Sequence, residues 1–163
     1  MRNTEPTSAD RAYTTVKELI VSGELPGGEL ISEGQIAART GTSRTPVREA
    51  FLRLAAEGWM RLYPKRGALI VPIAPDEAAH IVDARRLVET GSLAAFADDA
   101  ATRSAVADLM RASLDRQRAL ADDGDAHRFA AEDADFHTLV VTRGANPLLS
   151  TFYSGLRDRQ RRM

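Results

Sequence analysis

The chain has 163 residues, with 44% apolar residues, 28% charged residues and a formal net charge of −1. This length suits one domain or two small ones, and the near-neutral charge excludes a uniformly basic nucleic-acid coat and a polyacidic tail. The absence of cysteine excludes disulfides, a thiolate nucleophile and Cys-ligated metals. No apolar run is long enough to span a membrane, and the first ten residues lack the apolar segment of a secretory signal. We therefore expect a cytoplasmic protein with no membrane partner.

The first part of the chain is predicted to form a small helical domain, residues 10–73, after a polar, disordered N-terminus, residues 1–9. Apolar residues recur at helical spacing and predict three helices, over residues 10–22, 33–40 and 44–57. Residues 32–35 have the spacing of a capping box at the start of the second helix. Gly41 lies in the short turn that leads to the third helix, whose expected N-cap is Ser43.

Helical periodicity stops at Gly58, and the next two apolar segments, residues 59–63 and 68–71, predict short strands joined by a tight loop. Two helices joined by a glycine-containing turn and followed by a strand pair have the order of a winged helix-turn-helix domain. The remaining chain, residues 74–163, is alanine-rich and predicted to be all-helical. Its helices are expected near residues 75–99, 102–122, 125–143 and 147–162. The predicted fold class is therefore mainly α, with a β-hairpin wing in the first domain.

A local excess of basic residues favours DNA as the ligand of the first domain. Within residues 39–66, seven basic residues stand against two acidic ones. The third helix carries basic side chains four residues apart on one side of its N-terminal turns, where phosphate binds favourably. The candidate contacts are Arg44, Thr45 and Arg48 on this helix, and Lys65 and Arg66 at the hairpin tip. The alternative is an ordinary helical hairpin with a solvated arginine face, which charge alone does not exclude.

Several short stretches of the first domain resemble the GntR family of bacterial transcription regulators. They are residues 23–27, 36–39, 43–50, 57–59 and 64–67, together with Leu54, and the run SRTPVREA at residues 43–50 is highly specific to the family. The resemblance covers residues 11–73 and implies a regulator rather than an enzyme. It further implies a repressor that binds a short palindrome of double-stranded DNA as a homodimer.

The same resemblance implies which residues touch DNA, with the third helix in the major groove and the wing at the minor groove. The matching positions are Arg44, Thr45, Arg48, Lys65, Arg66 and Gly67. This chain departs from the family at Gly34, where many members carry a basic or polar residue that also contacts DNA. We expect that contact to be absent.

Three residues of the second half form a candidate ligand site. Asp133 and His137 are four residues apart beside an apolar helix stripe, and a carboxylate with an imidazole can donate two ligands to a divalent metal. The alternatives are a polar pair that satisfies itself at a partly buried position and an ion pair on the helix surface. Arg85 falls inside an apolar arc, where an arginine needs a buried acid or an anionic ligand. Its alternatives are extension into solvent and pairing with Glu89.

Residues 76–89, 124–137 and 146–149 are similar to the FadR-type subgroup, whose second domain is an all-α FCD domain. The resemblance implies a bundle that binds a small organic acid, often holds a divalent metal and commonly forms the dimer. Asp133 and His137 match its first two metal ligands, and Arg85 best matches an arginine near the acid.

The second domain also departs from this subgroup, because the usual domain supplies two more histidines from later helices. His80 and His127 do not match those positions, and we expect both to be exposed. The bundle, residues 74–163, is therefore expected to be truncated by about its last two helices, with apolar faces left for a partner chain or with low stability. A truncated regulator that acts through heterodimers, or a non-functional remnant, is the alternative function. A metal hydrolase fragment is a third reading, without a nucleophile–base pair or phosphate loop to support it.

Overall fold

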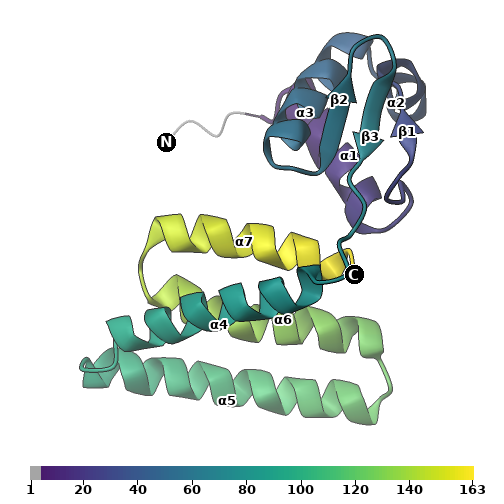
Figure 1. The fold of residues 1–163 in the computed structure, drawn as a ribbon. Coiled ribbons are helices and arrows are strands. Elements are labelled where there is room, and N and C mark those ends of the chain that lie inside the picture. Colours follow the sequence, from purple (N-terminus) through teal and green to yellow (C-terminus); the bar gives the residue numbers. More distant parts are fainter. Residues whose placement is uncertain (1–4) are drawn as a thin grey trace. The chain divides into compact units, whose positions relative to one another are not determined.

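The computed structural model describes residues 5–163. Over this range the chain forms seven helices and a three-stranded antiparallel sheet, which confirms the mainly α prediction (Figure 1). Two compact units divide the chain. The first is the chain up to Pro75 with Arg161–Met163, and the second is Asp76–Gln160.

The first unit has the element order expected of a winged helix-turn-helix. Its elements are α1 (Ser8–Val21), β1 (Leu30–Ile31), α2 (Glu33–Thr40), α3 (Arg44–Ala56), β2 (Met60–Tyr63) and β3 (Gly67–Ile70). The strand order is β1-β3-β2, so the predicted hairpin gains a third strand. Sequence periodicity missed β1 because two residues are too few to show alternation; its pairing of Leu30 with Leu69 spans much of the unit.

One hydrophobic core joins the helices and the sheet of this unit. The buried side chains include Val16 and Ile20 from α1, Ile36 from α2, Val47, Phe51 and Leu54 from α3, and Trp59, Met60 and Ile70 near the hairpin. Because α3 buries the stripe that faces α1, its opposite side is left exposed to solvent. That exposed side carries Arg44 and Arg48.

Helix α1 begins earlier than predicted. Residues 1–4 of the predicted disordered segment lie outside the described residues, but Thr7 is already the N-cap of α1. Its hydroxyl accepts from the backbone N–H of Asp10 at 3.1 Å, and its own N–H donates to the Asp10 carboxylate at 3.0 Å. The prediction of disorder at residues 8 and 9 is therefore wrong, because this capping box starts the helix there. The predicted capping box at Ser32 is confirmed, with Ser32 N–H to Gln35 Oε1 at 2.8 Å.

The second unit is a set of four helices. They are α4 (Glu77–Ala95), α5 (Ala100–Asp122), α6 (Ala126–Arg143) and α7 (Pro147–Arg161). Helix α6 packs against both α4 and α5. Gly144 permits a close approach of α6 to α4, since a Cβ there would lie 2.8 Å from the Cβ of Ser92. Tyr153 and Leu156 of α7 complete a small core with Val88 and Val141.

Several large apolar side chains of the second unit remain exposed. Val82 and Leu87 on α4 are 62% and 72% exposed, and Leu148 and Phe152 on α7 are 80% and 54% exposed. This agrees with the expectation of uncovered apolar faces; what covers them stays a prediction. Across residues 5–163, no helix combines the length and apolar character needed to cross a bilayer.

Candidate nucleic-acid interface

A short turn that contains Gly41 leads from the end of α2 to the start of α3. Gly41 ends α2 in the left-handed conformation, with φ 64°, and its N–H bonds back to the carbonyl of Ala37. Ser43 is extended and occupies the N-cap of α3, as predicted, but its side chain makes no capping hydrogen bond. The first N–H groups of α3 therefore lack this internal acceptor, which suits a helix end that meets phosphate oxygens.

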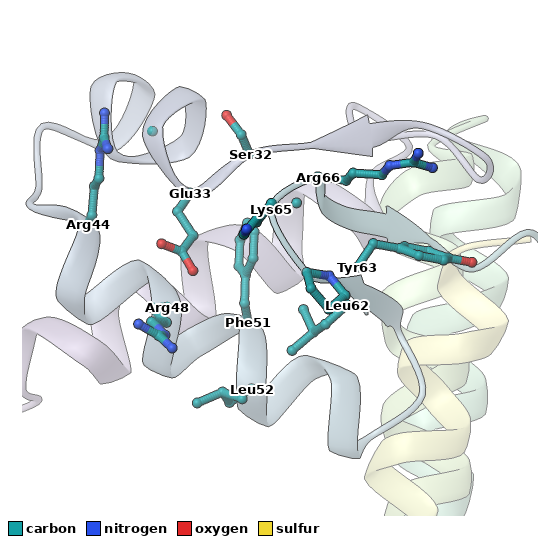
Figure 2. Close-up of a pocket in the computed structure, with 13 residues that line it drawn as sticks. Ser32, Glu33, Arg44, Arg48, Phe51, Leu52, Leu62, Tyr63, Lys65 and Arg66 are labelled. Carbon is teal, nitrogen blue, oxygen red and sulfur yellow. The ribbon is translucent and has the colours of Figure 1, made fainter.

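A groove of about 740 Å³ lies between α3, the start of α2 and the hairpin (Figure 2). It is lined by Ser32, Glu33 and Gly34, by Arg44, Arg48, Phe51 and Leu52 of α3, and by the hairpin residues 62–67. Figure 2 shows Arg44 and Arg48 on the helix side of the groove, and Lys65 and Arg66 on the hairpin side. Five of the six predicted DNA-contact residues thus gather around one groove. Thr45 is exposed on the same turn of α3 but does not line the groove.

The basic side chains that line this groove form no ion pair among the described residues. Arg44, Arg48, Lys65 and Arg66 are all exposed, and within residues 5–163 none of them has a carboxylate at ion-pair distance. Other arginines of the same unit are paired, Arg39 with Glu24 and Arg53 with Asp10 at 2.8 Å. Glu33 is the one acidic residue in the groove lining. Cations without internal partners can bind phosphate or base edges without first breaking an ion pair.

Gly67 has a structural role in the backbone of the wing. Its φ of 104° is disfavoured for any residue with a side chain, and a Cβ there would lie 2.2 Å from the carbonyl oxygen of Ile31. The close approach of β3 to β1 therefore requires glycine. Its predicted contact with DNA stays a prediction.

Apolar residues of the groove were missed by the sequence analysis. Leu52, Leu62 and Tyr63 are 55%, 40% and 41% exposed and form its apolar wall with the buried Phe51. Leu52 lies outside the core stripe of α3, and an apolar residue at such a position was the sequence signal that could have indicated an exposed apolar contact surface. Exposed apolar groups beside cations suit contact with thymine methyl groups.

The second unit brings Arg85, Asp133 and His137 into one polar cluster with Glu89 and Tyr153. The Nδ1 of His137 lies 2.7 Å from one carboxylate oxygen of Glu89, and its Nε2 lies 3.8 Å from Asp133. The other Glu89 oxygen accepts from the Tyr153 hydroxyl at 2.6 Å and from Arg85 Nε at 3.0 Å. Arg85 thus pairs with Glu89, which the sequence analysis gave as an alternative to an anionic ligand. Tyr153 was missed because it lies 64 residues from Glu89 along the chain.

Glu89 is held in its charged form by this cluster. Burial favours the neutral acid, but hydrogen bonds from Tyr153 and His137 outweigh it and keep the pKa of Glu89 below its usual value. Burial, followed by the hydrogen bond to Glu89, raises the pKa of Tyr153. The cluster therefore works as a self-satisfied polar network in a partly buried place.

The described residues do not fit a complete metal site. No three His, Asp or Glu side chains among residues 5–163 are grouped so that they could hold a metal ion. Asp133 and His137 supply two donors, whereas zinc sites take three or four protein ligands. His80 and His127 are exposed, as expected. Metal binding by Asp133 and His137 stays a prediction.

Two family models match the chain in tandem. The model described as bacterial regulatory proteins of the gntR family matches residues 8–70, and the FCD domain matches residues 80–163. The chain belongs to the GntR family of transcription regulators and carries an FCD domain. This membership confirms the resemblance seen in SRTPVREA and the expectation of a regulator rather than an enzyme.

Relatives of this GntR-family chain are similar along most of its length. A helix-turn-helix regulator of Streptomyces ambofaciens is 34% identical over 154 residues, covering 93% of this chain and 64% of the relative. The gluconate operon transcriptional repressor of Bacillus licheniformis is 32% identical over 136 residues, covering 80% of this chain and 53% of the relative. This chain therefore spans less than two thirds of either relative.

A solved structure shares the fold of this chain. The Escherichia coli protein McbR/YncC superposes with a TM-score of 0.69 at 20% sequence identity. The match covers 94% of this chain and 72% of that protein. At this identity the likeness shows the fold alone.

Proposed function

We propose that this chain is a sequence-specific DNA-binding repressor of transcription. The observation that carries the proposal is the groove between α3 and the hairpin, with four exposed cations that lack carboxylate partners among the described residues. Arg44 and Arg48 rise from the first turns of α3, the helix that enters the major groove in winged helix-turn-helix domains. Two of its GntR-family relatives are named as gluconate operon repressors, which supports repression as the mode of action.

The two parts of the groove have different roles in this proposal. Arg44 and Arg48 donate pairs of hydrogen bonds to guanine edges, for which the planar guanidinium is suited. Lys65 and Arg66 at the hairpin tip bind the backbone or the minor groove, and Thr45 donates its hydroxyl to phosphate. Base contacts then specify the sequence, while phosphate contacts fix the register.

A homodimer on a palindrome and control by a small organic acid complete the proposal. A twofold dimer presents two α3 helices to half-sites about one helical turn apart. The guanidinium of Arg85 is engaged with Glu89, Tyr153 and Gln160, the last through a 2.7 Å hydrogen bond. A carboxylate effector at Arg85 would exchange with these partners. It would regulate DNA binding only if its affinity differed between two conformations.

The test begins with selection of binding sites from random DNA duplexes, followed by titration of the enriched duplex. Arg44→Ala should weaken specific binding by about 1–3 kcal/mol, because a base contact is lost. Arg61→Ala is the matched control, since Arg61 is an exposed arginine of the same unit that does not line the groove. It should leave specific binding unchanged.

Three results would contradict the proposal. One is an Arg44→Ala variant with unchanged affinity, and another is an equal loss for Arg61→Ala. The third is wild-type binding that is weak, strongly dependent on salt and without sequence preference, as the phosphate attraction alone produces. That last result would favour a chain that acts through heterodimers or has lost its function.

A further inference from the structure

Gly34 occupies a helical position whose backbone has no need for glycine. It lies in the first turn of α2, and it is not among the glycines with positive φ. A glycine in a helix costs about 1 kcal/mol relative to alanine. The residue therefore weakens α2 without relieving any backbone strain, which directs attention to the atoms that a side chain there would meet.

A side chain at position 34 would meet Arg44. The three heavy atoms nearest to an added Cβ are Nη2, Nε and Cζ of Arg44, at 3.4, 3.6 and 3.7 Å. All three belong to the guanidinium group, which lies over the start of α2. Figure 2 shows Arg44 extending from the beginning of α3 beside Glu33, while Arg48 lies one turn further along the helix. The guanidinium of Arg44 thus lies at van der Waals distance from the Cβ of a side chain at position 34, in the path of any larger side chain there.

We propose that Gly34 is a specificity-determining position, because its missing side chain sets where the guanidinium of Arg44 lies and hence which base Arg44 reads. The inference rests on the proposed DNA binding and adds a positioning residue to it. Recognition of guanine needs two N–H groups held in a fixed plane. Arg44 has no carboxylate partner among the described residues, so no ion pair there holds its guanidinium beside position 34.

The expected effect of a substitution at Gly34 depends on the size of the new side chain. Alanine adds a Cβ at ordinary van der Waals distance from Arg44 and should leave the guanidinium in place. Leucine extends beyond Cβ into the space of the guanidinium and should push Arg44 toward the groove. Leucine offers no hydrogen bond to DNA and is a better helix former than glycine. A change caused by Gly34→Leu therefore does not come from an unfolded α2 or from a new polar contact.

The experiment selects preferred sequences from random duplexes with wild type, Gly34→Ala and Gly34→Leu, each with and without Arg44→Ala. Gly34→Ala should keep the wild-type preference. Gly34→Leu should change the preferred base at the position that Arg44→Ala alone makes degenerate, and should bind the wild-type sequence about tenfold more weakly. In the Arg44→Ala background, Gly34→Leu should have no further effect. Thermal melting of every variant checks that the domain stays folded.

Two outcomes would overturn the inference while the proposed function stands. In one, wild type selects a sequence and Gly34→Leu selects the same one with the same affinity. In the other, Gly34→Leu changes the preference equally in the absence of the Arg44 guanidinium, which would mean that the side chain at position 34 acts on DNA directly. A wild-type protein that enriches no sequence would instead overturn the proposed function, and this inference with it.

Discussion

At the residue scale, the arginines of the first unit are of two kinds: some pair with a carboxylate of the same unit, and others are exposed without such a partner among the described residues. Arg53 reaches Asp10 on α1 at 2.8 Å, and its guanidinium lies 4.0 Å from the centre of the Tyr13 ring. Arg44 and Arg48, on the same helix as Arg53, have no such partner among the described residues. A single helix thus uses one face for packing and charge pairing, and leaves the cations of another face exposed.

The carboxylate of Asp10 should make stability depend on pH. Hydrogen bonds from Thr7 and then Arg53 lower the pKa of Asp10 to about 2, from an ordinary value of 3.8. Because the folded pKa is the lower one, this contribution is present above about pH 4 and is lost as the pH falls toward 2. The melting temperature of Asp10→Asn should lie below that of wild type at pH 7, and the gap should narrow toward pH 3.

The control for this experiment is Glu29→Gln. The side chain of Glu29 is exposed and makes no hydrogen bond with the described residues, so Glu29→Gln should leave the melting curve unchanged at either pH. A gap between Asp10→Asn and wild type that stays constant from pH 7 to pH 3 would contradict the assignment.

Gly67→Ala should destabilise the wing by more than about 1 kcal/mol, because alanine is strained at this φ and its Cβ would overlap the Ile31 carbonyl. Gly23→Ala is the matched control, since Gly23 also has positive φ, 81°, but nothing lies within 4 Å of an added Cβ. Urea unfolding of both variants measures the difference. Equal losses for the two would show that the approach of β3 to β1 does not matter.

At the element scale, a polar network rather than a large apolar core joins α4, α6 and α7. Glu89 on α4 meets His137 on α6 and Tyr153 on α7, and Arg85 adds a second link between α4 and α7. The apolar cluster beside this network is small, with Val88 and Leu156 among its members. Hydrogen bonds to the Glu89 carboxylate therefore connect these three helices.

Removal of the Tyr153 hydroxyl should weaken this helix junction. Tyr153→Phe removes the hydrogen bond that the hydroxyl donates to the partly buried carboxylate of Glu89. This should lower the free energy of unfolding by about 1–3 kcal/mol. Tyr63→Phe removes the same atom from an exposed ring whose hydroxyl makes no hydrogen bond with the described residues, and should not measurably change the free energy of unfolding. Should both variants unfold like wild type in urea, the Glu89 network would contribute no stability.

At the scale of the whole molecule, the two units have separate cores of unequal size. The core of the first unit draws buried residues from three helices and the sheet. The second unit buries fewer apolar side chains along its four helices and leaves residues such as Leu87 and Leu148 exposed. Two units with separate cores can unfold independently.

Calorimetry of the full chain should therefore show two transitions, with the second unit unfolding first. Tyr153→Phe should lower only the first transition, and Gly67→Ala only the second, which assigns each to its unit. If the exposed helix faces are buried in a homodimer, the lower transition should rise with protein concentration. One transition that moves as a whole with either variant would contradict independent units.

Local signals in the sequence were sufficient for the helices of both units and for the hairpin. Capping boxes, turn glycines and apolar periodicity act within a few residues, so they can be recognised without the fold. The capping box at Ser32 and the helix start at Arg44 were predicted in this way, whereas the start of α1 at Ser8 was not. The candidate DNA-contact residues also lie in two continuous segments, residues 44–48 and 65–67, whose charge is plain in the chain.

Other features were decided by tertiary structure alone, because their partners are distant in the chain. Strand β1 is too short to show a pattern and exists through its pairing with β3. The bond from Tyr153 to Glu89 joins two helices with two others between them in sequence, and no local rule couples their faces. Likewise, the short distance between position 34 on α2 and the guanidinium of Arg44 on α3 depends on how the turn at Gly41 places the two helices. Sequence periodicity determines which face each helix buries, whereas contacts between those faces depend on how the helices pack.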